Sequence, residues 1–150
     1  MKPVFLLGAT LAAASTIAAP LAMAQPAHMG RWITESGNLE VEIAPCADAP
    51  LLCGTVVREL AQRSMSAPGE PMDPADKRPV LGMKILTDLQ PAGDEALRGQ
   101  IYNRENGRHY SVHLTMDGPG QLLVRPYVVL PLFGKTQLWH RAAASSGEAN

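Results

Sequence analysis

The chain has 150 residues, with 13 Lys and Arg against 14 Asp and Glu, which gives a formal net charge of −1 at pH 7. Proteins that bind nucleic acid or anionic membranes carry clustered Lys and Arg, so this balance argues against both kinds of partner. The length suits one domain that buries roughly two-thirds of its unfolded surface, and it leaves no room for a second.

The first 24 residues have the pattern of a secretory signal peptide. Lys2 supplies a positive charge, residues 4–19 are almost entirely apolar or small, and residues 22–24 read Ala-Met-Ala, a small-residue cleavage signature. The apolar run is shorter than a membrane-spanning helix needs, and Pro20 interrupts it. We therefore predict cleavage after Ala24, a periplasmic or secreted location and no stable membrane anchor.

Cys46 and Cys53 are the two cysteines of the chain, and the turn-like stretch ADAPLL separates them. In an oxidising compartment two such cysteines are expected to form a disulfide. The reactive C-x-x-C spacing is absent, so a structural bond is favoured over a redox-catalytic one.

From residue 28 onward the chain reads as short alternating runs separated by turn residues, the pattern of an antiparallel sheet with one solvated face. About eight strands result, enough for a small closed up-and-down barrel without exposed edges, and a β-sandwich is the alternative. We expect the domain to cover residues 25–142. The first expected strand surrounds Trp32, and the second runs from Leu39 to Ile43. The other six cover residues 53–60, 80–89, 97–102, 109–116, 121–129 and 135–141.

Two segments lack the alternating pattern. Residues 61–79 carry four prolines, a glycine and mixed charge, and long irregular loops of this kind tend to be lids, binding loops or disordered segments. We expect this loop to shape the mouth of the barrel. The tail over residues 143–150 is small and polar, and we expect it to be disordered.

Several motifs in this order resemble one family. They are Gly30-x-Trp32, then GQIYNRENGRHY over residues 99–110, and then PLFGKTQLWHR over residues 131–141. The chain is similar over residues 30–141 to the DUF2147 family of exported bacterial proteins. It departs from the family at two places. Pro126 stands where glycine is usual, so local strand pairing is in question there, and the long loop lacks the usual Asn-Pro.

The resemblance implies a lipocalin-like barrel of the calycin group and says little about activity. Calycins typically have a Gly-x-Trp near the start of the first strand and an arginine near the end of the last. Here these residues are Gly30, Trp32 and Arg141, to which the resemblance gives a structural role. An arginine over the tryptophan ring would close one barrel end, with a cation–π contact of about 0.5–2 kcal/mol.

Two pairs of polar side chains invite a reading as catalytic or metal sites. His109 and His113 fall on one expected strand, where four residues separate them by roughly 13 Å, too far to share one metal ion. Glu40 and Glu42 are about 7 Å apart, within the range of paired catalytic carboxylates, but alternating glutamates on a solvent-facing strand are the simpler interpretation. We therefore expect no catalytic residue, no metal, no cofactor and no enzymatic activity.

The segment from Leu130 to Gly134 is unusually apolar for a connecting turn. It either plugs the barrel end, with Phe133 in a structural role, or forms a contact with a partner or ligand. Both interpretations stay open.

An eight-stranded barrel has just enough width to be packed with its own side chains or to hold one small ligand. Our first hypothesis is an envelope protein that binds a small hydrophobic or amphipathic molecule, and the alternative is a filled barrel that acts as a structural or protein-interaction module. The inward strand positions expected to line a ligand site are Met83, Ile85, Tyr110, Val112, Leu114 and Tyr127.

Overall fold

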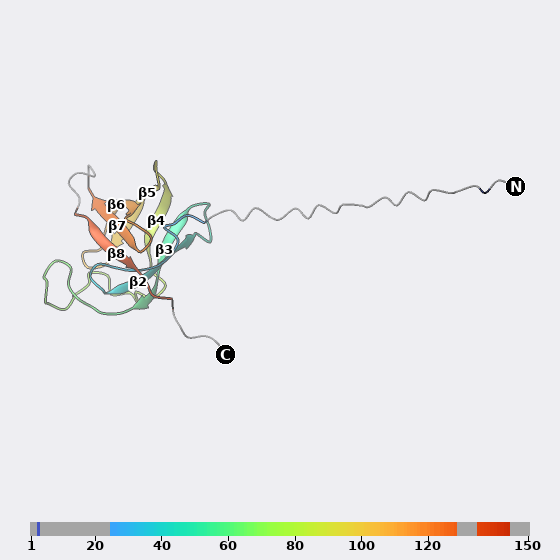
Figure 1. Cartoon of the computed structure of the whole chain (residues 1–150). Coiled ribbons are helices and arrows are strands. Elements are labelled where there is room, and N and C mark those ends of the chain that lie inside the picture. The colour runs from blue at the N-terminus through green and yellow to red at the C-terminus, as the bar shows by residue number, and fades with distance from the viewer. Residues whose placement is uncertain (1–2, 4–24, 129–134, 145–150) are drawn as a thin grey trace.

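The computed structural model describes residues 25–128 and 135–144, together with Pro3. All regular structure in these residues is β-strand, and within them no helix could cross a membrane. Figure 1 shows the strands curling into a barrel, with the connection between β3 and β4 projecting from it in green. The strands are β1 (Gly30–Ile33), β2 (Leu39–Pro45), β3 (Leu52–Glu59), β4 (Lys84–Pro91), β5 (Ala96–Asn103), β6 (Arg108–Met116), β7 (Gln121–Tyr127) and β8 (Gln137–Arg141).

The sheet closes on itself, so the prediction of an up-and-down barrel is confirmed. Each strand pairs antiparallel with its neighbour in the sequence, and β1 also pairs with β8, where Trp32 lies opposite Arg141 and Ile33 opposite His140. This last pairing excludes the β-sandwich, whose two sheets would keep separate edges. Closure satisfies the backbone groups that an open sheet would leave exposed on its edge strands.

The apolar face of each strand points into the barrel. On β6, Val112 and Leu114 are fully buried, whereas His109 on the alternate face is exposed. Side chains from all eight strands meet in one core, because period-2 alternation in a closed sheet brings every inward face together. The fully buried core side chains include Trp32, Val41, Ile43, Leu86, Val112, Leu114, Leu122 and Val124.

The beginning of β4 differs from the sequence prediction. Residues 80–83 form a turn in which the Met83 N–H donates to the Val80 carbonyl, and Gly82 has a φ of 81° that few other residues adopt. Leu81, expected in the strand, is 65% exposed. Alternation alone does not reveal this turn, since Leu81 and Met83 carry the apolar character of strand residues.

Pro126 does not interrupt the pairing of β6 with β7. The register runs without a shift from Met116 opposite Leu122 to Ser111 opposite Tyr127, and Pro126 lies opposite Val112. Proline lacks an N–H, so it removes one donor from the ladder while leaving the strand direction intact.

The burial of Glu40 contradicts the prediction of a solvent-facing glutamate pair. Its side chain is buried because two arginines from neighbouring strands cover it: Arg58 Nη2 lies 2.7 Å and Arg31 Nη1 3.7 Å from its carboxylate oxygens. Arg31 also lies 3.6 Å from Glu42. The pair is part of an ion-pair cluster across β1, β2 and β3, which gives it a structural explanation.

The two cysteines form the expected disulfide. Cys46 follows β2 and Cys53 lies in β3, with their Cα atoms 5.1 Å apart. The Cys46 N–H donates to the Leu51 carbonyl, so the bond encloses a tight connection between the two strands.

Arg141 joins several backbone segments at one end of the barrel, which we call the closed end. Its guanidinium carbon lies 4.1 Å from the centre of the Trp32 ring, and its nitrogens donate to the carbonyls of Pro119, Met29 and Ala27 at 2.8–3.0 Å. A Cβ on Gly30 would come within 2.8 Å of Arg141 Nη1. The Gly-x-Trp and the distant arginine therefore meet in space.

Candidate ligand-binding pocket

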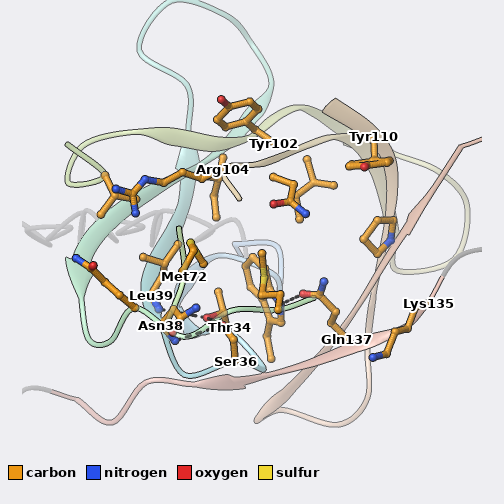
Figure 2. Close-up of a pocket in the computed structure, with 18 of the residues that line it drawn as sticks. Thr34, Ser36, Asn38, Leu39, Met72, Tyr102, Arg104, Tyr110, Lys135 and Gln137 are labelled. Carbon is orange, nitrogen blue, oxygen red and sulfur yellow. Dashed lines mark hydrogen bonds between the residues drawn. The ribbon is translucent and has the colours of Figure 1, made fainter. Parts of the chain in front are cut away.

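A cavity of about 280 Å³ lies at the opposite end of the barrel, which we call the open end. The connections over residues 34–38, 60–83 and 104–107 form this end, as Figure 2 shows around the cavity. Most of its wall is apolar, and the volume is just below the range of pockets that hold drug-sized molecules. Its apolar lining includes Leu39, Val80, Ile85, Ile101, Tyr110 and Trp139.

Four of the six predicted lining residues face the interior, at two different depths. Ile85 and Tyr110 line the cavity itself. Val112 and Leu114 are fully buried in the core next to Tyr110 on β6. The cavity therefore occupies only the part of the interior nearest the open end, while the remainder is packed.

The remaining two predicted lining residues are Met83 and Tyr127. Met83 lies in the turn before β4, where it packs against the core and does not line the cavity. Tyr127 belongs to the cavity lining at the end of β7, where it lies opposite Ser111 with its ring edge-on to His113. The β6–β7 register places Tyr127 on the same face as Ser111, opposite to the face of Val112 and Leu114.

The long loop forms part of the cavity wall through Ala61, Gln62, Met65 and Met72. Buried Asn38, in the turn between β1 and β2, holds the start of this loop in place. Its side-chain amide accepts from the Arg63 N–H at 2.9 Å and donates to the Arg63 carbonyl at 2.8 Å. In sequence Asn38 reads only as a turn residue, so its role in positioning the mouth was missed.

Two carboxylates hold the same loop against the end of β5 and the turn that follows it. Glu105 accepts hydrogen bonds from the hydroxyls of Ser64 and Ser66 and, at 2.9 Å, from the Met65 N–H. Asp76 accepts from the Tyr102 hydroxyl at 2.7 Å and pairs with Arg78. The mouth of the cavity therefore depends on charged hydrogen bonds between segments far apart in the sequence.

These contacts shift the pKa values of both carboxyls. Partial burial raises the pKa of Glu105, but the hydrogen bonds from Ser64, Met65 and Ser66 together outweigh it and leave the pKa below its ordinary value. Hydrogen bonds from Arg78 and then Tyr102 hold the pKa of Asp76 well below its usual range. In their ionised form, both side chains therefore stabilise the long loop in its position beside the cavity.

Acid is expected to release the loop from Glu105. Because the pKa of Glu105 in the folded protein is lower than its ordinary value of 4.5, the stabilising contribution is complete above that pH and disappears as the pH falls through the folded-state value. Hydrogen-exchange protection factors of the amides over residues 62–72 should therefore fall as the pH is lowered from neutral through the folded-state pKa of Glu105. The variant Glu105→Gln should show low protection already at neutral pH.

Glu70→Gln is the matched control, since Glu70 is an exposed glutamate of the same loop. It should keep the protection and the acid response of the parent protein. Protection that stays constant from neutral to acid pH in the parent protein would show that Glu105 does not hold the loop.

The polar groups of the wall largely bond within the protein. The Trp139 indole N–H donates to Gln137 at 3.0 Å, and the Asn106 side chain donates to the Tyr110 hydroxyl at 2.8 Å. In the part of the chain that the structure describes, no three His, Cys, Asp or Glu side chains gather as a metal site would need. His109 instead contacts the Tyr102 ring, with 4.7 Å between ring centres.

Three sequence predictions fall outside the described residues. They are the signal peptide with its cleavage after Ala24, the apolar 130–134 segment with Phe133, and most of the tail. Val128, directly after β7, and Lys135, shortly before β8, flank the second of these segments and belong to the cavity lining.

Comparison with known proteins gives a family and a fold. A family model described as "Uncharacterized protein conserved in bacteria (DUF2147)" matches residues 30–141. No curated protein sequence matches the chain significantly. Among solved structures, the chain is similar to protein HP1028 from the human pathogen Helicobacter pylori, described as belonging to the lipocalin family, with 19% identity, a TM-score of 0.54, and coverage of 77% of this chain and 82% of that one.

Proposed function

The chain belongs to the DUF2147 family of bacterial proteins, and we propose that it is an exported binding protein that holds a small hydrophobic or amphipathic molecule at the open end of its barrel. The observation that carries the proposal is the cavity of about 280 Å³ with a mostly apolar wall. When a ligand covers apolar surface that faces a water-accessible cavity, the removal of this surface from water favours binding. A filled barrel would instead need a packed interior at this end.

Export is supported by two observations. Residues 1–24 carry the signal-peptide pattern, and Cys46 and Cys53 form a disulfide, a bond that persists in oxidising compartments such as the periplasm. We propose a role in binding and not in catalysis because most of the cavity wall is apolar, as is typical of sites that bind small hydrophobic molecules.

Blocking the cavity should weaken the binding of an apolar fluorescent probe such as N-phenylnaphthylamine. Ala61 lines the cavity from the long loop, and it is partly exposed, so Ala61→Trp adds bulk there without overfilling the packed core. We expect the Kd of the probe to rise about tenfold or more, since forcing extra atoms into an occupied space carries a penalty of about 1–3 kcal/mol. Fluorescence titration measures the change.

The control is Ala92→Trp, a similarly exposed alanine in the turn after β4, at the closed end of the barrel. It should bind the probe as the parent protein does. Equal affinities in all three proteins would mean that the probe binds elsewhere, and no binding to the parent protein would argue for the alternative, a barrel that acts through protein contacts.

A further inference from the structure

Arg104 is an unusual member of the cavity wall. It begins the turn between β5 and β6, and only 15% of its side chain is exposed. Its Nε is buried without a hydrogen-bond partner in the part of the chain that the structure describes. Its Nη1 lies 3.6 Å from Glu59 Oε1, which is an ion pair at a distance too long for a hydrogen bond.

A buried donor without an acceptor is unfavourable and rare in folded proteins. Arg104 lines the cavity, so a ligand with a negatively charged acceptor group meets the positive charge of Arg104 there, which a hydrocarbon alone cannot do. A guanidinium is also permanently charged, and its hydrogen bonds to a carboxylate are about twice as strong as hydrogen bonds between two neutral groups.

The charge of the cavity lining also favours a ligand with a negatively charged group. Its charged side chains are Arg104 and Lys135 against Glu59 alone. In Figure 2, Arg104 and Lys135 lie on opposite sides of the lining, and Leu39 and Met72 lie on the side of Arg104. One surplus cation suits a head group with one negative charge, whereas a phosphate monoester carries about −1.5 to −2 at neutral pH.

We infer that the occupant of this pocket is an amphipathic carboxylic acid, bound as its anion with the carboxylate at Arg104 and a short hydrocarbon body over Ile85 and Ile101. This inference rests on the proposed binding function and specifies its ligand class. The modest volume of about 280 Å³ favours a medium-length chain over a long one.

Calorimetric titration of the parent protein with decanoate, decanol and decyltrimethylammonium tests the inference. The three probes share one hydrocarbon body and differ in the charge of the head. We expect decanoate to bind about tenfold or more tightly than decanol, and the ammonium most weakly. In Arg104→Gln the ratio of decanol to decanoate Kd should fall to about one, while the decanol Kd stays within about twofold.

Two further variants control the charge change and the fold. Arg98→Gln removes an exposed arginine of β5 outside the cavity lining and should keep the preference for decanoate. Arg104→Gln leaves Glu59 without its ion-pair partner, so Arg104→Gln/Glu59→Gln removes both charges and should lose the preference as well. Thermal unfolding shows which variants are folded.

The outcomes separate the two proposals. Equal binding of decanoate and decanol to the parent protein, or tighter binding of the ammonium, overturns the carboxylate assignment and leaves the binding function standing. A preference for decanoate that survives in both Arg104 variants overturns the role of Arg104. If neither the three probes nor N-phenylnaphthylamine binds the parent protein, the proposed binding function itself is wrong.

Discussion

Replacing Trp32 with alanine should lower the free energy of unfolding by about 3–5 kcal/mol, the range for removing a large buried aromatic side chain. Trp32 is fully buried in the core, its indole N–H donates to the His28 carbonyl at 2.8 Å, and Arg141 lies over its ring. The change therefore removes packing, a hydrogen bond and a cation–π contact together. A domain of this size is stable by about 5–15 kcal/mol, so urea unfolding should still show a shifted transition.

Trp32→Phe separates these contributions. It keeps an aromatic face for Arg141 and loses the indole N–H, so its loss of stability should be well below that of Trp32→Ala. A midpoint for Trp32→Ala close to that of the parent protein would show that the closed end does not depend on this side chain.

Gly99→Ala should cost about 3 kcal/mol or more, a large effect for one methyl group. A Cβ on Gly99 would lie 2.5 Å from the Thr87 carbonyl oxygen and 2.9 Å from that of Asp88. Asp88 has a φ of 54°, and the β4–β5 register is irregular between Thr87 and Gln90, so the backbone of β4 passes close over β5 at this point. Because the clash involves backbone atoms, rotation of a side chain cannot relieve it.

Gly120→Ala is the matched control. A Cβ on Gly120 would meet no atom within 4 Å, and its φ lies outside the left-handed region. Its stability should stay within about 0.5 kcal/mol of the parent protein, as for most surface substitutions. Similar denaturant midpoints for the two alanine variants would contradict the close approach of β4 to Gly99.

The candidate site was predictable only in part. Ile85 and Tyr110 were found because they occupy apolar positions of alternating strands, and the long loop was recognised by its prolines. Asn38 and Arg104 carried no such signal, since a turn asparagine and a turn arginine are ordinary surface residues in sequence. Their roles depend on the 60–83 connection folding back over the open end, which no local pattern specifies.

The sequence by itself determined the order of the strands, their antiparallel pairing and the disulfide, and it left a closed barrel and a β-sandwich as alternatives. Period-2 alternation, turn residues and cysteine spacing are local properties, and the antiparallel pairing of successive strands follows from short connections. Only the tertiary structure decided where the interior is packed and where it is hollow, which face Tyr127 takes, and that Glu40 is buried. These features depend on register shifts and on side chains from strands and loops distant in sequence, whose combined volume and charge fill the barrel at one end and leave a cavity at the other.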